Sequence, residues 1–301
     1  MTEPIRIAVP RKGRPLEAVL DRLAEGTGDA ALADDIASTL RYEKAVTKGN
    51  KRDERDVYRR LAEYGELSDP AAPEYTLLRD DRAGMPRRIV FDSVTVEADG
   101  VPVQLVGREE PFRAVRTHEF ALGFDSADLV LEEVVQLREA PLGSIADLNA
   151  RIDPQDTDVR VVNGLGDTVY HTLMGTPAVR RQGSADELTR EFVADYEGSL
   201  CISPRYERLV RAVLGTEAMT GVDFCYPAEG AEEEATIADV GLGVYLTMTG
   251  STARSHGLEL GERLFPSETV LMENVVETTD RSDVVTELFA AGEFETELAV
   301  Q

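Results

Sequence analysis

The chain has 301 residues, of which 42% are hydrophobic, enough for two domains with cores of their own. Its 57 acidic and 32 basic side chains give a formal net charge of −25, and such a charge repels nucleic acid and anionic membranes. No apolar run approaches the roughly 20 residues of a membrane span, and the N-terminus lacks the layout of a secretory signal. We therefore expect a cytoplasmic protein with no nucleic-acid or membrane partner.

The composition also indicates adaptation to a salt-rich cytoplasm. Acidic residues are spread along the chain, and lysine occurs only as Lys12, Lys44, Lys48 and Lys51. High salt screens the self-repulsion that would destabilise such a fold in dilute buffer. We expect a halophilic protein whose circular dichroism spectrum changes on dialysis to millimolar salt.

The cysteine and histidine residues predict no metal site. Cys201 and Cys225 stand alone rather than in a CxxC pair, and His118, His171 and His256 have no ligand spacing. Two reduced, partly buried thiols are the expected state.

A short apolar strand over residues 5–10 opens the chain, followed by the basic turn Arg11-Lys12-Gly13-Arg14 and a helix. Ligands of open α/β sheets bind beyond the carboxyl ends of strands, where Lys12 and Arg14 would lie. The alternative is that both are solvated charges on a turn.

Residues 29–106 give the weakest pattern. A locally basic stretch over 41–60 resembles a polar helix, and residues 88–105 alternate in polarity around Asp99-Gly100, which predicts a β-hairpin.

Short strands and helices alternate through the rest of the chain. A strand over 120–124 leads to Asp125, Ser126 and Asp128, an acidic strand end typical of a cleft edge. The Gly-x-Gly loop over 163–168 is predicted to precede a helix, and a strand over 198–203 leads into a helix that begins near Tyr206. This order predicts an α/β protein with two lobes around a cleft.

The most informative stretch runs from residue 237 to residue 258. An apolar strand enters Thr249-Gly250-Ser251-Thr252, after which a helix resumes. Unpaired N–H groups at a helix start, hydroxyl donors and a glycine suit a phosphate. The alternative is an ordinary capped loop.

Four blocks in this order resemble ATP phosphoribosyltransferase, the first enzyme of histidine biosynthesis. They are the opening strand and turn (6–14), the segment 108–132 with Arg108 and Asp128, the segment 201–214 with Tyr206, and the stretch from Glu232 or Glu233 through Thr249–Thr252 to Leu258. The resemblance implies the two-lobed fold also used by type II periplasmic binding proteins.

The resemblance also implies a reaction that joins ATP, or another purine nucleotide, to phosphoribosyl pyrophosphate. With ATP, adenine N1 attacks the ribose anomeric carbon and Mg²⁺-pyrophosphate leaves. Thr249, Gly250, Ser251 and Thr252 would hold the 5-phosphate, with Arg108, Asp128 and Tyr206 as further substrate contacts. Lys12, Arg14, Glu232 and Glu233 would be the catalytic residues. Positioning and charge stabilisation, rather than a strong base, would carry such chemistry.

Some positions depart from the family pattern. Tyr245 stands where the family loop has Asp, and His256 stands where it has Asn. Sugar recognition is then altered, or the chain is a non-catalytic cytoplasmic protein of the same fold that senses a phosphorylated metabolite. His256 is either an acid or base or a surface histidine.

The expected lobes are residues 1–130 with 263–301, carrying an insertion at about 29–106, and residues 131–262 with the phosphate loop. The stretch after Asn274 is short for the regulatory domain of the family's long form, so the resemblance implies a separate regulatory subunit. A homo-oligomer is also expected.

Overall fold

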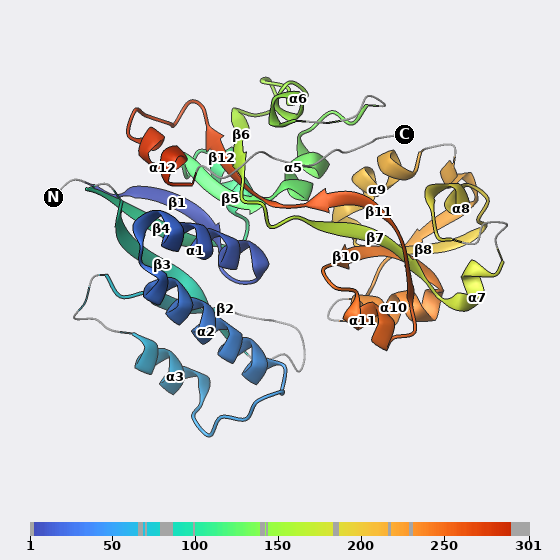
Figure 1. The fold of residues 1–301 in the computed structure, drawn as a ribbon, viewed down its shortest axis with the longest axis horizontal. Coiled ribbons are helices and arrows are strands. Elements are labelled where there is room, and N and C mark those ends of the chain that lie inside the picture. The colour runs from blue at the N-terminus through green and yellow to red at the C-terminus, as the bar shows by residue number, and fades with distance from the viewer. Residues whose placement is uncertain are drawn as a thin grey trace. The chain divides into compact units, whose positions relative to one another are not determined.

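The computed structural model describes residues 3–65, 69, 71–78, 87–98, 100–138, 142, 144–182, 187–215, 218–228 and 231–289. The chain divides into two compact units, each with its own β-sheet (Figure 1). Of the described residues, unit 1 comprises those within 3–126, 157–167 and 269–289, and unit 2 comprises those within 127–156 and 168–268. The α/β prediction is confirmed.

Unit 1 is a seven-stranded mixed sheet in the order β2-β3-β4-β1-β5-β12-β6. Central β1 runs parallel to β4 and β5, while β3 and β12 are antiparallel to their neighbours. The strands are β1 (Ile5–Pro10), β2 (Glu74–Leu78), β3 (Arg88–Ala98), β4 (Val101–Arg108), β5 (Leu122–Ser126), β6 (Val159–Gly164) and β12 (Thr269–Asn274). The helices are α1 (Arg14–Thr27), α2 (Ala30–Thr47), α3 (Val57–Tyr64), α4 (Pro111–Arg116) and α12 (Ser282–Leu288).

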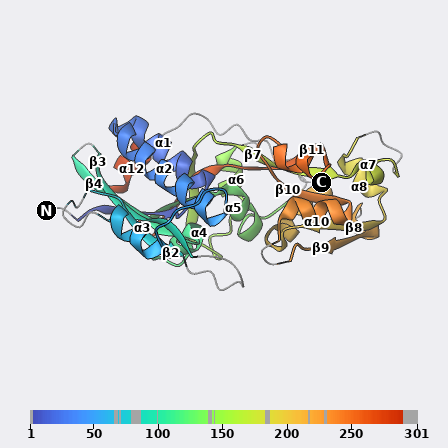
Figure 2. The same ribbon diagram turned by 90° about the horizontal axis from the view of Figure 1, so that it is seen from below.

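The core of unit 1 follows from alternation along the strands. Ile7 and Val9 of β1 lie in one buried cluster with Leu16 and Leu20 of α1. Figure 2 shows α1 and α12 on one side of this sheet and α4 on the other. Because β1 and β4 are parallel neighbours, the loops that follow them lie at the same end of the sheet.

Two predictions for residues 29–106 need correction. The predicted polar helix over 41–60 is wrong, because α2 ends at Thr47 and α3 begins separately after Asp56, whose carboxylate caps it by accepting from the Arg59 N–H. The stretch is also not simply an insertion, since β4 lies between β3 and β1 within the sheet. The hairpin between β3 and β4 is confirmed, although Asp99 lies outside the described residues.

Unit 2 is a five-stranded sheet in the order β11-β7-β10-β8-β9. Its strands are β7 (Val169–Gly175), β8 (Gly198–Ile202), β9 (Val222–Cys225), β10 (Leu242–Thr247) and β11 (Glu259–Ser267). Strand β8 runs parallel to β9 and β10, whereas β7 is antiparallel to β10 and β11. The helices are α5 (Ala127–Glu133), α6 (Ile145–Asn149), α7 (Pro177–Arg180), α8 (Arg190–Ala194), α9 (Glu207–Leu214), α10 (Glu233–Val240) and α11 (Ser251–Ser255), with 3₁₀ turns η1 (Pro204–Tyr206) and η2 (Ala218–Gly221).

The prediction of a helix directly after the 163–168 loop is wrong, because the loop is followed by strand β7. Its sequence, VYHTLMG, is apolar and pairs on both sides, with β10 and β11. The unit boundaries also differ from the expected lobes at residues 157–167, since β6 pairs with β12 in the first sheet. Within the described part of the chain, no helix is long and apolar enough to cross a membrane.

Candidate functional site

The Thr249–Thr252 loop follows β10 and begins the short helix α11 (Figure 1). Gly250 has φ 69°, a left-handed conformation that favours glycine, and a Cβ there would lie 2.3 Å from Leu260 Cδ1, so the exposed Leu260 side chain would have to move. Thr249, Ser251 and Thr252 are exposed, and Thr249 Oγ1 lies 3.1 Å from Ser251 Oγ. The loop therefore presents three hydroxyls to solvent.

A pocket of about 250 Å³ lies at the carboxyl ends of parallel strands β8 and β10. Such strand ends are where α/β sheets bind ligands. The pocket brings together Tyr206 and Glu233, two of the predicted site residues, and adds groups from β7, the turn after β8, α9 and β10. Its full lining is His171, Ser203, Arg205, Tyr206, Val210, Glu233, Val244, Tyr245 and Leu246.

Tyr245, which stands where the family pattern has Asp, lines the pocket together with Glu233. Burial foremost, and then the negative charges of Glu233 and Glu234, raise the pKa of the Tyr245 hydroxyl. The phenol is therefore a neutral hydrogen-bond donor rather than a second carboxylate.

The neighbouring Glu232 contacts the end of helix α11, which begins in the Thr249–Thr252 loop, and does not line the pocket. Its carboxylate Oε2 lies 3.6 Å from Nε2 of His256, the residue that ends α11. The N-terminus of α10 thus contributes Glu233 to the pocket and Glu232 to the end of the loop helix.

Asp128 is buried beneath the pocket rather than exposed to a substrate. Its Oδ2 lies 2.7 Å from Nε2 of His171, and its Oδ1 accepts the Leu129 N–H at 3.0 Å. Asp128 therefore does not line the pocket itself but orients His171, which does.

Glu132 and Arg208 hold the end of α5 and the start of α9 together. Glu132 accepts from the N–H groups of Arg208 and Leu209 at the start of α9. Arg208 in turn donates to main-chain carbonyls of Leu131, Glu132 and Val135 around the end of α5. Burial raises the pKa of Glu132 and lowers that of Arg208. This reciprocal capping is a structural role.

In unit 1, Lys12 and Arg108 lie at the carboxyl ends of adjacent parallel strands, where Pro10 pairs with Arg108. Lys12 Nζ is 3.8 Å from Glu109, and the Arg108 guanidinium donates to Glu119 at 2.7 Å and lies over the Phe120 ring. Both cations are partly exposed, so they remain able to contact an anionic ligand.

Arg14 is more deeply engaged than Lys12. Its guanidinium forms an ion pair with the Asp167 carboxylate and donates to the Asp167 carbonyl at 2.7 Å. The same carboxylate accepts the N–H and hydroxyl of Thr269, each at 2.7 Å. Arg14 therefore links the start of α1 to the ends of β6 and β12.

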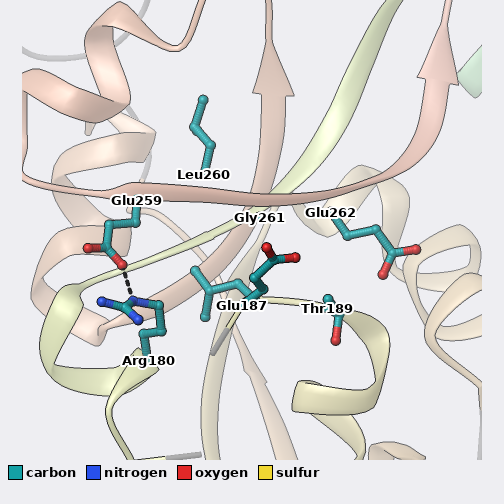
Figure 3. Close-up of a pocket in the computed structure, with 8 residues that line it drawn as sticks. Arg180, Glu187, Thr189, Glu259, Leu260, Gly261 and Glu262 are labelled. Atoms are coloured by element: carbon teal, nitrogen blue, oxygen red, sulfur yellow. Dashed lines mark hydrogen bonds and ion pairs between the residues drawn. The ribbon is translucent and has the colours of Figure 1, made fainter. Parts of the chain in front are cut away.

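A second pocket of unit 2, of about 480 Å³, lies beside edge strand β11 (Figure 3). It carries three carboxylates, from Glu187, Glu259 and Glu262, of which Glu259 pairs with Arg180 and Glu262 with Arg190. A lining rich in carboxylates disfavours a phosphate ligand. The pocket at the ends of β8 and β10 is therefore the stronger candidate.

The sequence pattern did not single out His171 or Arg205 as site residues. His171 lies on the strand that was expected to be helical, and its partner Asp128 is 43 positions away. Arg205 directly precedes the predicted site residue Tyr206 in the turn after β8. That adjacency in sequence could have indicated Arg205 as a site residue. Across the described ranges, no group of three or more His, Cys, Asp or Glu side chains could hold a metal ion.

Comparison with known proteins identifies the family. The model of the family described as halobacterial ATP phosphoribosyltransferase matches residues 1–300. No curated protein matches the chain. Among solved structures, an ATP phosphoribosyl transferase (HisG:HisZ) complex from Thermotoga maritima is similar at 15% identity and TM-score 0.45, covering 95% of this chain and 96% of that one.

More distant similarities cover less of the chain. The reduced form of the regulatory domain of OxyR2 from Vibrio vulnificus has 10% identity and TM-score 0.36, covering 62% of this chain and 78% of its own. An arginine-bound ArgBP mutant from T. maritima has 9% identity and TM-score 0.35, with 63% and 76% covered. By the full-length family match, this chain belongs to the halobacterial ATP phosphoribosyltransferases, the histidine-biosynthesis enzymes that join ATP to phosphoribosyl pyrophosphate.

Proposed function

We propose that unit 2 of this chain binds phosphoribosyl pyrophosphate, with the 5-phosphate at Thr249–Thr252 and the ribose in the pocket lined by Tyr206, Glu233 and Tyr245. The observation that carries this proposal is that one strand, β10, both lines the pocket and leads into the hydroxyl-bearing loop. A sugar phosphate needs these two subsites next to each other. The site relies on hydroxyls and fixed dipoles, which suits a reaction driven by positioning and charge stabilisation.

For unit 1 we propose that Lys12 and Arg108 contact phosphates of the nucleotide. Both side chains are partly exposed at one edge of the sheet, and their carboxylate partners are exposed residues. Arg14, by contrast, supports the turn through Asp167. Glu232 supports the phosphate loop through His256.

We propose that Mg²⁺ enters with the pyrophosphate group. Mg²⁺ is held by one or two carboxylates together with substrate phosphates, so it does not need a cage of protein ligands. Glu233 is the carboxylate that lines the pocket and could contact it. When bound, the ion offsets charge on the leaving pyrophosphate.

The test is to incubate the pure chain in molar KCl with Mg²⁺, ATP and phosphoribosyl pyrophosphate, and to detect phosphoribosyl-ATP and pyrophosphate by mass spectrometry. Thr252→Val should raise the KM for phosphoribosyl pyrophosphate about tenfold or more, because a hydrogen bond to a charged group is lost. Thr117→Val, at an exposed position at the end of α4, is the matched control and should change nothing.

The outcomes separate the enzyme from a sensing protein. Product formation that is weakened by Thr252→Val supports the proposed site. Product formation that is indifferent to Thr252→Val rejects the loop as the phosphate site. Thermal protection by phosphoribosyl pyrophosphate without product would favour a sensing protein.

From the family resemblance we also propose that the chain binds a separate regulatory subunit and forms a homo-oligomer. Analytical ultracentrifugation of the pure chain in molar KCl measures the second directly. A single species with the mass of one chain over the micromolar range would reject it.

A further inference from the structure

The buried Asp128–His171 pair is the feature of the pocket that the proposed substrate contacts leave unexplained. Its oxygen and nitrogen are 2.7 Å apart, and the two side chains are only 2% and 5% exposed. Asp128 has its other oxygen on the Leu129 N–H, so the carboxylate is fixed in place. Burying two ionisable groups costs free energy unless they are paired in good geometry. The 2.7 Å contact between Asp128 and His171 meets that condition.

Aromatic rings fix the imidazole as well. Phe265 stacks on it with ring centroids 4.3 Å apart and an interplanar angle of 18°, and Tyr206 meets it edge-on at 4.7 Å. Directly opposite on β10, Leu246 pairs with His171 in the strand register. Side chains from α5, β11 and η1 thus contact the ring at once, which is the rigid support that a reacting group needs.

One ring nitrogen remains available. Nε2 faces Asp128, which is an acceptor when ionised, so the Nε2 proton is donated to it and the neutral ring keeps its lone pair on Nδ1. Within the described residues, Nδ1 has no hydrogen-bond partner, and the ring is part of the pocket lining. A carboxylate that orients an imidazole whose other nitrogen is open is the arrangement of a general base.

The charges around the pocket decide which part of the reaction such a base would serve. The ionisable groups that contact His171 or line the pocket with it are Asp128 from α5, Arg205 and Tyr206 from η1, Glu233 from α10 and Tyr245 from β10. Asp128 and Glu233 supply two carboxylates, against the single cation of Arg205, which is exposed. Two carboxylates favour a group that becomes positive, whereas the charge of the departing pyrophosphate is offset by the Mg²⁺ proposed to enter with it. His171 therefore suits the nucleophile rather than the leaving group.

We propose that His171 is a catalytic residue whose Nδ1 takes a proton from the adenine amino group. The N1 lone pair forms the bond to the ribose anomeric carbon, and the bond from that carbon to pyrophosphate breaks, with its electron pair leaving on pyrophosphate. The adenine amidine becomes cationic, and its exocyclic N–H proton passes to Nδ1, which returns the adenine ring to neutrality. Asp128 stabilises the resulting imidazolium, and solvent later removes the proton. This inference rests on the proposed function.

The test compares His171→Gln with wild type in steady-state kinetics from pH 5.5 to 9. A glutamine can still donate to Asp128 but cannot take up a proton. We expect kcat to fall about a hundredfold while both KM values stay within threefold, because general-base catalysis contributes about 10²–10⁴ in rate. Wild-type kcat/KM should fall on the acid side with unit slope, and that acid-side decrease should be lost in the variant.

His118→Asn is the matched control, since it removes one of the chain's three histidines at an exposed position of unit 1. This variant should keep both the wild-type kcat and the acid-side decrease in kcat/KM, because neither depends on His118. His171→Asn is the second variant in case the glutamine does not fold, and folding is checked by near-UV circular dichroism and by thermal protection with phosphoribosyl pyrophosphate.

An active wild type whose folded His171 variants keep kcat and the acid-side decrease would overturn the base, while the proposed function would stand. A wild type that forms no phosphoribosyl-ATP would instead defeat the proposed function itself. Folded variants with unchanged kcat but raised KM would also overturn the base, by making His171 a binding residue only.

Discussion

Asp167 in unit 1 and Asp128 in unit 2 each hold a basic side chain just beyond the end of a strand, but their surroundings differ. Asp167 receives Arg14 and two hydrogen bonds from Thr269, so it joins three segments of one unit. Asp128 holds His171 by one nitrogen, and the imidazole borders a pocket. A predicted site residue at a strand end is thus informative only once its other contacts are known.

The largest expected effect comes from Asp128→Asn. The amide keeps the shape of the carboxylate but no longer stabilises an imidazolium, so we expect kcat to fall about a hundredfold, within the range of general-base contributions. Initial rates at saturating substrates measure this, with a circular dichroism melt as the folding control. A fall of less than threefold in a folded variant would remove the distinction drawn between the two aspartates.

Arg14→Met should affect stability more than catalysis. Removing the cation leaves Asp167 with the Thr269 donors alone, and we expect a loss of about 2 kcal/mol in unfolding free energy, below the roughly 3–5 kcal/mol of a fully buried pair. Arg113→Met is the matched control, because its ion pair with Glu110 is exposed and contributes about 0–1 kcal/mol. Urea titrations in molar KCl give both values. A normal stability with a hundredfold lower kcat would instead return Arg14 to the catalytic residues.

Gly250→Ala tests the loop Thr249–Thr252, where we propose that the 5-phosphate binds. The new methyl group would meet the Leu260 side chain, and alanine disfavours the left-handed backbone of this position, so Leu260 must move and the loop conformation is strained. We expect the KM for phosphoribosyl pyrophosphate to rise about tenfold, the effect of roughly 1.4 kcal/mol. Gly49→Ala has a similar positive φ but open space, and it separates backbone strain from the lost loop shape. Equal KM values in the two variants would count against the loop.

The smallest effect concerns Cys201, a buried group on β8 that pairs with Cys225 in the strand register. Burial raises the pKa of the Cys201 thiol to about 12, so little thiolate exists at about pH 8. In the native protein we expect iodoacetamide to label Cys225 first and the slow labelling of Cys201 to increase with pH. Mass spectrometry of the peptides reports each site. Rapid labelling of Cys201 at that pH would show that burial does not protect it.

Local patterns in the sequence sufficed for part of the fold. The alternation over 88–105 predicted the hairpin, and the apolar run before Thr249 predicted the strand that enters the loop. The pairing of β4 with β1 was out of reach, because parallel partners are set by contacts between distant segments rather than by periodicity. His171 was missed for the same reason, since neither its strand neighbours nor Asp128 is near it in sequence.

The crossings of the chain between the two units have a consequence for synthesis. Strand β12, at residues 269–274, lies between β5 and β6 in the seven-stranded sheet. Until it has emerged from the ribosome, β5 presents an unpaired edge and β6 has no partner strand, and unpaired strands promote aggregation. The first sheet is therefore complete only after residue 274 has been synthesised, and neither unit corresponds to one continuous segment of the chain.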